Sequence, residues 1–281
     1  MSPRARHFIR FLVVAAVFLF VAKTCFGSRV VDVVTFNIEN YPKSERQVDG
    51  AFEALEAIEP EIVALQEIRK PEEFRFELRS RLGSRWHTAW PNPSPRHHVG
   101  LAYDSGLFEF LSSETHRTTE VCPGAACKPT LEVRLRRKGG AEETLAVFVV
   151  HLKAYDDGID ERREQYRALQ DILQAARDRG DRIVLAGDFN STRAEDRELI
   201  AKLAATYQLR WPTRRLDCTG YWKPENRCLG TALDHILVDG ASPPGAGRGP
   251  CRSVGCDPGE SCPVFFHQVS DHCPVTVALP P

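Results

Sequence analysis

The sequence has no excess of charge of either sign. Its 281 residues contain 37 Lys and Arg against 38 Asp and Glu, a formal net charge of −1. A protein that grips nucleic acid through its overall charge is basic, so this balance excludes that class. It does not exclude nucleic acid as a substrate, because a bound divalent cation and local arginines can hold one phosphate.

The N-terminal apolar run is too short for an ordinary transmembrane helix, which takes about 20 residues. The run at 11–22 has 12 residues and follows a basic stretch. This pattern predicts a secretory signal peptide over 1–27, with cleavage after Gly27. An uncleaved signal anchor is one alternative, and Cys25 suggests a lipoprotein, which Thr24 before it disfavours. We therefore expect a secreted or periplasmic protein, membrane-anchored if the signal is not cleaved.

The rest of the composition is that of a globular protein, with 42% hydrophobic and 27% charged residues. Nothing in it indicates collagen, a coiled coil or extended disorder. No convincing linker interrupts the chain, so we predict one domain over 28–281, with an irregular excursion rich in Cys, Gly and Pro at 241–263. Removal of 1–27 takes away four of the 37 basic side chains and no acidic one, which leaves 33 against 38, a net of −5.

The cysteines number nine, and the predicted cleavage would remove one and leave eight. An even number in an exported chain indicates disulfides. Their spacing suggests two short loops, Cys122–Cys127 and Cys218–Cys228. The last four could then pair in three ways; they are Cys251, Cys256, Cys262 and Cys273. Zinc bound by clustered thiols is the rival interpretation.

Two stretches of the sequence share a strand–helix–strand pattern, in which apolar β-branched runs flank an amphipathic helix. The first has strands over 30–37 and 62–65 and a helix opened by Ser44, with Gln47 as its capping-box partner. The second has strands over 145–150 and 182–186 around a helix over 160–179. Further strands are predicted over 100–103, 107–111, 131–136, 236–238 and 275–278, and a further helix over 194–207. The repetition predicts a pseudo-duplicated α/β sandwich.

Five short segments each carry an acid, a base or an amide that suits phosphate-ester chemistry. In order they are Thr35-Phe36-Asn37, Leu65-Gln66-Glu67, His151-Leu152-Lys153, Gly187-Asp188-Phe189-Asn190 and Ser270-Asp271-His272. Ligands of open α/β sheets bind at the carboxyl ends of strands, where we expect these residues to meet. Each alone has an ordinary explanation, such as an Asx turn at Asp188 or a core histidine at His151. The set favours a hydrolytic site.

With Leu233-Asp234-His235, these motifs resemble the signature series of the endonuclease/exonuclease/phosphatase superfamily, over residues 30–278. The resemblance implies a four-layer α/β sandwich, with two mixed β-sheets packed face to face and flanked by helices. It also implies a metal-dependent phosphoric-ester hydrolase. His151 is similar to the deoxyribonuclease I, sphingomyelinase and phosphatase branches, since the exonuclease III branch has tyrosine there. One departure is the Arg-His-His stretch at 96–98, where deoxyribonuclease I has a glutamate.

The residue types then predict a cation site. A hard cation neutralises the phosphodiester charge and polarises a phosphoryl oxygen. Glu67 is the best direct ligand, with Asn37 and Asp271 beside it. Mg²⁺ prefers such oxygen ligands and keeps several waters, and Mn²⁺ or Ca²⁺ are alternatives.

The remaining motif residues would handle protons and phosphate oxygens. Asp188 has the character to orient or deprotonate the attacking water, and Asn190 to hold a phosphate oxygen. His272 would contact the phosphate or act as the base, with Asp234 orienting its ring. His151 would donate a hydrogen bond or a proton towards a phosphate oxygen. The residues alone leave open which histidine is the acid and which the base.

A second group of residues is expected to contact the substrate outside the reacting centre. Arg96 and His97 could bind phosphate or form an exposed polar loop, and Lys153 and Arg162 could steer a phosphate or only solvate a helix. Exposed aromatics can stack bases or dip into a membrane interface. The candidates for that role are Tyr221 and Trp222.

The sequence thus predicts an exported phosphodiesterase, foremost a nuclease acting on nucleic acid as a monomer without a dedicated protein partner. A sphingomyelinase-like phospholipid phosphodiesterase and a phosphomonoesterase are alternatives on the same fold. A non-catalytic binding protein is a further alternative, which survival of the acid–base set disfavours.

Overall fold

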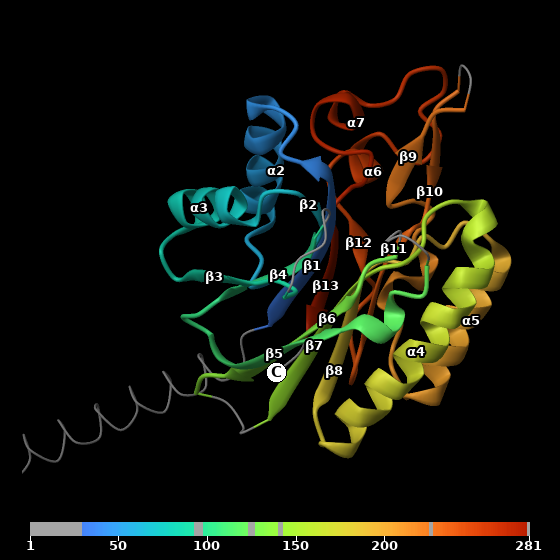
Figure 1. The fold of residues 1–281 in the computed structure, drawn as a ribbon. Coiled ribbons are helices and arrows are strands. Elements are labelled where there is room, and N and C mark those ends of the chain that lie inside the picture. The colour runs from blue at the N-terminus through green and yellow to red at the C-terminus, as the bar shows by residue number, and fades with distance from the viewer. Residues whose placement is uncertain (1–29, 93–97, 123–126, 140–142, 225–226, 280–281) are drawn as a thin grey trace, which may run out of the picture.

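The computed structural model describes residues 30–92, 98–122, 127–139, 143–224 and 227–279. They form two β-sheets packed face to face between two layers of helices (Figure 1). The predicted fold class, a four-layer α/β sandwich, is therefore confirmed. The signal peptide predicted at 1–27 lies outside the described residues.

One sheet has six strands in the order β12-β13-β1-β2-β4-β3, and the other has five in the order β11-β8-β7-β6-β5. A separate hairpin pairs β9 with β10. The strand bounds are β1 Val31–Tyr41, β2 Ile62–Ile68, β3 Trp86–Ala89, β4 His98–Asp104, β5 Phe108–His116, β6 Thr130–Arg137, β7 Thr144–His151, β8 Arg182–Asp188, β9 Gly220–Trp222, β10 Leu229–Thr231, β11 Asp234–Val238, β12 Ala246–Gly247 and β13 Val275–Leu279.

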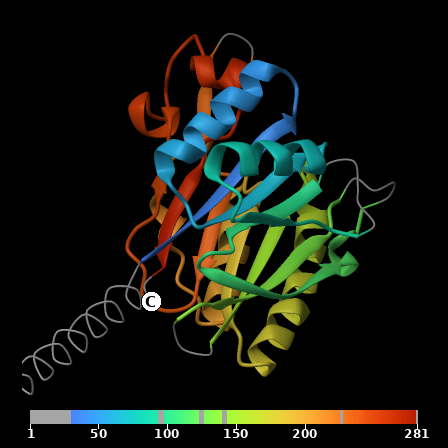
Figure 2. The ribbon, with the colours of Figure 1, turned by 90° about the vertical axis from the view of Figure 1, so that its left-hand side faces the viewer.

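The helices lie on the outer faces of the two sheets. The six-stranded sheet is covered by α2 (Glu45–Ile58) and α3 (Pro71–Leu82), and the five-stranded sheet by α4 (Ile159–Asp178) and α5 (Ala194–Thr206), as Figure 1 shows. Figure 2 shows the molecule from the side of α2 and α3. The short α6 (Pro250–Ser253) and α7 (Val264–Gln268) come between β12 and β13 in the sequence. No helix in the described ranges is long and apolar enough to cross a membrane.

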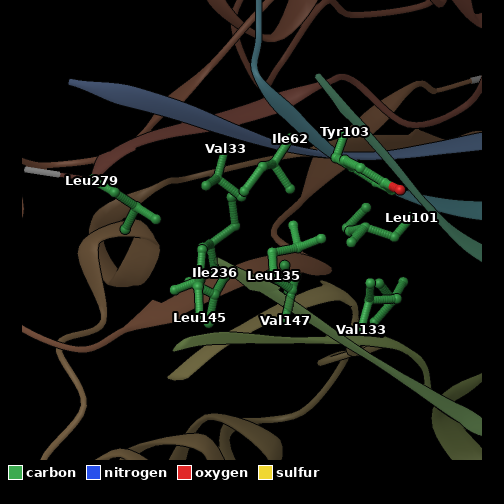
Figure 3. Packing of buried hydrophobic residues seen from close by; sticks show 14 of the residues in the cluster. Val33, Ile62, Leu101, Tyr103, Val133, Leu135, Leu145, Val147, Ile236 and Leu279 are labelled. Carbon is green, nitrogen blue, oxygen red and sulfur yellow. The ribbon is translucent and has the colours of Figure 1, made fainter. Parts of the chain in front are cut away.

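The main core lies between the two sheets. Side chains of one sheet, such as Val33 and Ile62, meet those of the other, such as Leu135 and Val147, in a continuous buried cluster (Figure 3). These positions alternate along their strands because successive side chains point to opposite faces. Burial of this kind is the dominant favourable term in folding, and it fixes the two sheets against each other.

The two strand–helix–strand units are present as predicted, and each holds a parallel strand pair. In the first, Asn37 on β1 lies beside Gln66 on β2, and in the second His151 on β7 lies beside Asp188 on β8. Parallel strands end at the same edge of a sheet, so each unit presents its polar residues at one edge. Packing of the sheets then brings the two edges together.

The predicted helix start at Ser44 is confirmed. Ser44 caps α2 by accepting a hydrogen bond from Gln47 N through Oγ, at 3.2 Å. The reciprocal half of the predicted capping box is not formed, because Gln47 Oε1 accepts from Lys43 N, at 2.6 Å, and not from Ser44 N. The buried Gln47 side chain donates through Nε2 to the carbonyls of Ile38, Glu39 and Val269. It therefore ties the end of β1 to the segment that precedes the Ser270-Asp271-His272 motif.

The structure corrects two strand ends and adds elements that the sequence patterns did not reveal. The strands continue past Asn37 and Leu65, so Asn37 and Glu67 lie within β1 and β2, next to a break in strand register. Glu67 has a left-handed φ of 61°. The helix α3 was not predicted, because its inward face holds only Phe74 and Leu78 whereas Phe76 is 70% exposed. The strand β3 and the hairpin were also missed.

The disulfides confirm one predicted pair and correct another. Cys122–Cys127 is present, but the predicted Cys218–Cys228 pair is wrong. In the hairpin Gly220 lies opposite Thr231, a register that keeps residues 218 and 228 from facing each other. Both thiols instead reach the 241–263 excursion, in the pairs Cys218–Cys256 and Cys228–Cys262, and the fourth bond is Cys251–Cys273. All eight of these cysteines are bonded, so the zinc interpretation is also wrong.

Candidate active site

Four motif residues from the two units converge between the sheet edges. Asn37 Nδ2 lies 3.0 Å from Asp188 Oδ2 and 3.4 Å from Glu67 Oε1. His151 Nε2 lies 3.6 Å from Asp188 Oδ2 and 4.0 Å from Glu67 Oε1. Asp188 is almost completely buried at the centre of this group. The predicted gathering of these residues is therefore present in the fold.

His272 and Asp234 lie at the same centre, Asp234 at the start of β11 and His272 in the loop before β13. β11 runs antiparallel to β8 with Asp234 directly opposite Asp188. His272 Nδ1 lies 2.7 Å from Asp234 Oδ2, and its Nε2 lies 3.7 Å from Asp188 Oδ2. Thr219 Oγ1 also donates to Asp234 Oδ2, at 2.7 Å. The predicted orientation of the His272 ring by Asp234 is therefore seen directly.

The surrounding carboxylates set the charge of His272. Burial by itself lowers the pKa of this imidazole, but Asp234, Asp188 and Asp271 outweigh it and raise the pKa well above its ordinary value. This environment favours the protonated form of the His272 ring. Both ring nitrogens carry protons in that state, so Nε2 can donate a hydrogen bond to an anion.

The site shifts the pKa values of Glu67 and Asp271 in opposite directions. Burial raises the pKa of Glu67, but the charges of His151 and His272, with hydrogen bonds from Asn40 and Asn37, lower it overall. The pKa of Asp271 is raised to about 6 by burial and then by the nearby carboxylates Glu39, Glu67 and Asp188, against the effect of His272. Negative charge is therefore concentrated around Glu67 and Asp271, which is what a cation site requires.

Glu67 and Asp271 are the residues that could hold a divalent cation. Their side chains keep 20% and 36% of their surface exposed, and Asp271 Oδ1 is buried without a hydrogen-bond partner among the residues that the structure describes. Ligand atoms of Asp188, Asp234 and His272 also lie within 4.8 Å of one another. We assign that trio to proton handling instead, because an imidazolium has no lone pair to offer a metal.

Asn37 occupies a different position from the predicted ligand. Its Oδ1 accepts from Glu39 N at 3.1 Å, and its Nδ2 faces Glu67 and Asp188. The amide oxygen is thus turned away from the two carboxylates. In this arrangement Asn37 donates to both carboxylates, which favours a positioning role; cation binding by Asn37 stays a prediction.

A second carboxylate–histidine cluster lies on β5 and β6. Glu114, His116 and Glu132 have ligand atoms within 4.8 Å of one another. His116 Nε2 lies 2.8 Å from Glu132 Oε2, and Arg179 forms an ion pair with the other oxygen of Glu132. The guanidinium supplies the positive charge that a metal would bring, so this cluster reads as a structural ion-pair network.

Asn190 links the two loops that follow β7 and β8. Its backbone N donates to Asp188 Oδ1 at 2.8 Å, which is the predicted Asx turn, and its φ is 47°. Its Nδ2 donates to Leu152 O at 3.0 Å. Asn190 therefore fixes the loop beside His151, and contact with a phosphate oxygen stays a prediction.

The structure separates the predicted substrate residues into different groups. Arg162 is fully buried; it forms two hydrogen bonds to Asp196, at 2.7 and 3.0 Å, and donates to the carbonyls of Lys153 and Tyr155. It cannot meet a substrate, so that prediction is corrected. The side chain of Lys153 is half-buried in the same loop and donates weakly to Ala154 O.

The aromatic pair is divided in the same way. Tyr221 is buried among the disulfides, and its hydroxyl donates to Gly255 O at 2.6 Å, so its predicted stacking role is corrected. Trp222 is 51% exposed. Gly220, two residues earlier, bridges to His272, which places the hairpin beside the site. Arg96 and His97 lie outside the described residues.

Two residues near the site were missed by sequence reasoning. Ser270 Oγ donates to Asn37 O at 2.7 Å and accepts from His272 N, so it joins β1 to the His272 loop. Lys128, next to the Cys122–Cys127 staple, has its pKa lowered by burial, and the charge of Glu67 acts on it in the opposite direction. Ser270 stood in a motif and could have been found, whereas nothing local distinguishes Lys128 from a surface lysine.

Comparison with known proteins identifies the scaffold. The sequence matches the model of the endonuclease/exonuclease/phosphatase family over residues 34–272. This chain belongs to that family. It is a metal-dependent phosphoric-ester hydrolase, as family membership shows. No curated protein sequence matches the chain.

Solved structures of the family share the fold at low sequence identity. The Danio rerio TDP2 complex with single-strand DNA product has a TM-score of 0.66 and 15% identity, and the match covers 89% of this chain and 98% of that one. The human Nocturnin catalytic domain with bound sulfate has 0.64 and 19%, covering 89% and 93%. A mannosyl-6-phosphatase of Bacteroides thetaiotaomicron has 0.66 and 15%, covering 89% and 99%. The similarity confirms the architecture.

Proposed function

We propose that this family member is a nuclease that hydrolyses phosphodiester bonds of nucleic acids with Mg²⁺, or with Mn²⁺ or Ca²⁺ in its place. One observation carries the proposal. Asp188 lies within 4 Å of His151 and His272 and is joined to Glu67 through Asn37, so water activation, cation binding and anion binding share one centre. That combination is what attack on an anionic phosphodiester requires.

A cation held by Glu67 and Asp271 would neutralise the phosphate charge and polarise a phosphoryl oxygen. The protein's own groups do the rest. Asp188 takes the proton of the attacking water, whose oxygen forms the new P–O bond as the bond to the leaving oxygen breaks. Charge then develops on the phosphoryl oxygens, and the His272 imidazolium faces it. Preorganised donors of this kind supply a large part of enzymatic rate enhancement.

His151 is placed to act on the leaving group. Within the described part of the chain its Nδ1 is buried and has no hydrogen-bond partner, whereas its Nε2 faces Asp188 and Glu67. It is thereby distinct from His272, whose Nδ1 is bound to Asp234. We infer that His272 binds the phosphate as a cation and His151 delivers a proton to the leaving oxygen.

Two further features support a polymeric substrate. Trp222 is an exposed aromatic on a hairpin that adjoins His272, and base stacking on such a ring contributes about 1–3 kcal/mol per base. A structural neighbour, Danio rerio TDP2, was solved with a single-strand DNA product. A phosphomonoesterase is the second candidate, since another neighbour is a mannosyl-6-phosphatase.

We also propose that the protein works in an oxidising compartment after removal of residues 1–27. Four disulfides in the described chain support this location. Intact-mass analysis of protein exported by a producing cell tests it. A mature N-terminus at residue 28 is expected, and an unprocessed chain that stays inside the cell would contradict it.

The test of activity compares substrates with the same enzyme preparation. We expect nicking of plasmid DNA with Mg²⁺, abolished by EDTA and by His151→Ala. The matched control is His87→Ala, which removes an exposed histidine of β3 outside the site. Phosphate release from a sugar monophosphate alone would favour the phosphomonoesterase, and choline release from sphingomyelin alone would favour a phospholipid enzyme. Inactivity on all three with any divalent metal would overturn the proposal.

A further inference from the structure

A cavity of about 380 Å³ lies beside the active site and is lined by four arginines. We call it the arginine pocket; the four are Arg193, Arg197, Arg214 and Arg215. Asp217 is the one carboxylate among the lining residues. This density of positive charge contrasts with the whole chain, whose formal net charge is −1.

Two chain segments that carry catalytic residues also contribute to the lining of the pocket. Ser191 follows Asn190 directly, and Ala232 stands two residues before Asp234. Ser191 Oγ donates to Ala232 O at 2.7 Å, and the neighbouring Phe189 N donates to Leu233 O at 2.9 Å. The pocket and the reacting centre are therefore built on the same pair of hydrogen-bonded chain segments.

Three of the arginines are free to bind an anion. Arg193 is neutralised by Asp156, with which it forms two hydrogen bonds of 2.8 and 2.9 Å. Within the described chain, Arg197, Arg214 and Arg215 form no ion pair with a carboxylate. Arg214 and Arg215 are exposed at the rim of the pocket.

Two of these arginines are held in place by an aromatic platform. The guanidinium groups of Arg197 and Arg214 lie over the Trp211 ring, 5.3 and 5.9 Å from its centroid. Arg197 Nη2 also donates to Arg214 O. The indole is fixed in turn, because its Nε1 donates to the buried His235 Nδ1 at 3.3 Å. The charges are thus partly preorganised before any ligand arrives, which lowers the entropy that binding costs.

Guanidinium groups match phosphate because their planar fork donates two parallel hydrogen bonds. We propose that the arginine pocket binds a second, uncleaved phosphate of the substrate backbone. This proposal rests on the proposed nuclease function and deepens it. A nucleic acid can occupy the reacting centre and the arginine pocket at once with two of its phosphates, and a phosphate monoester cannot.

The test uses the exposed arginines of the pocket, whose removal leaves the packed Arg197 and the catalytic residues intact. The double variant Arg214→Ala/Arg215→Ala is compared with Arg75→Ala/Arg79→Ala, two exposed arginines of α3 on the opposite helical layer. Anisotropy of a fluorescein-labelled single-stranded oligonucleotide in EDTA reports binding without cleavage. We expect the pocket variant to bind roughly tenfold to a hundredfold more weakly, the range for lost charge-assisted hydrogen bonds.

Two further readouts separate this pocket from a general loss of fold. The salt slope of binding should fall by about 0.7 for one single-strand phosphate contact, and hydrolysis of bis-p-nitrophenyl phosphate, which carries one phosphate, should be unchanged. Equal oligonucleotide binding by wild type and pocket variant, or no binding by either, overturns the pocket. Binding that depends on the pocket without any cleavage of nucleic acid would instead retain the pocket and overturn the nuclease.

Discussion

Asp234 and His272 are joined by a 2.7 Å hydrogen bond between two almost completely buried side chains. The bond fixes the ring so that Nε2 faces Asp188. It also keeps the ring charged, because Asp234 is the carboxylate that raises the His272 pKa most strongly. Orientation and charge of this histidine thus have one source.

Asp234→Asn should distinguish the effect of the shape of this side chain from the effect of its charge on His272. The amide keeps the size of the side chain but removes the charge that stabilises the imidazolium, so the pKa of His272 should fall. A rate that needs protonated His272 declines as pH rises through this pKa, so the alkaline limb of the pH–rate profile should move to lower pH. The rate should drop by roughly 10²–10⁴. An unshifted alkaline limb, or an unshifted NMR titration of His272, would show that Asp234 serves packing only.

Asn37→Asp tests whether this residue positions the site or binds the cation. A ligand replaced by a carboxylate would keep or strengthen metal binding. A positioning amide that donates to Glu67 and Asp188 would instead be replaced by a repelling charge. We expect a loss of about 10–100-fold in Mg²⁺ affinity, as for residues that orient a metal ligand, measured by calorimetry. Asn92→Asp, at an exposed position, is the control, and tighter Mg²⁺ binding by Asn37→Asp would refute the assignment.

His235 should make the fold sensitive to acid. Burial, and then the charge of Arg197, lower the pKa of His235 to about 3. An unfolded histidine takes up its proton near pH 6.5, so between about 6.5 and 3 the unfolded state binds more protons and stability falls as pH drops. Protonation of His235 in the unfolded state lowers the free energy of unfolding by about 1.4 kcal/mol per pH unit over this range.

His235→Gln should therefore flatten the decline in unfolding free energy between pH 6.5 and 5, as urea titrations would show. The exposed His87→Gln should leave it as in wild type. An equally steep decline in the His235 variant would mean that carboxylates alone cause the acid sensitivity.

Lys128→Ala should weaken substrate use without loss of fold. The ammonium group is half-buried and senses the charge of Glu67, so we expect it to meet the substrate anion. kcat/KM should fall roughly tenfold to a hundredfold, as for a lost charge-assisted hydrogen bond. The exposed Lys70→Ala is the control. An unchanged kcat/KM in the Lys128 variant would remove this residue from the site.

The Cys251–Cys273 bond should support activity as well as stability. It closes a sequence separation of 22 residues and ends beside His272, and a loop of this length is worth about 3 kcal/mol. Serine at both positions should lower the melting temperature and reduce kcat. The matched pair Cys228→Ser/Cys262→Ser should cost similar stability but less activity, since neither cysteine adjoins a catalytic residue. Equal activity losses would show that the bond acts only through global stability.

The sequence revealed the features that are local in the chain. Apolar runs followed by polar motif residues predicted both strand–helix–strand units, and the order of the motifs predicted which side chains would meet. Helix α3 was not predicted from the sequence, because only two of its residues are buried. The role of Asn37 as a cation ligand stays a prediction, because the direction in which its amide points depends on Glu67 and Asp188, which come from other strands.

Contacts between distant segments account for the remaining errors. Arg162 at the start of a helix resembles a solvated charge, and only its burial against Asp196, 34 residues away, reveals its structural role. The cysteine pairs depend on hairpin register, which short spacing does not convey. The arginine pocket combines two stretches that are unremarkable when read separately.

The covalent link from the excursion to Cys273 has a biological corollary. If thiols must be oxidised before the neighbouring imidazole is held in place, newly made chains in a reducing cytoplasm remain dormant. For the proposed exported nuclease, this order of events would delay activity until the chain reaches an oxidising compartment.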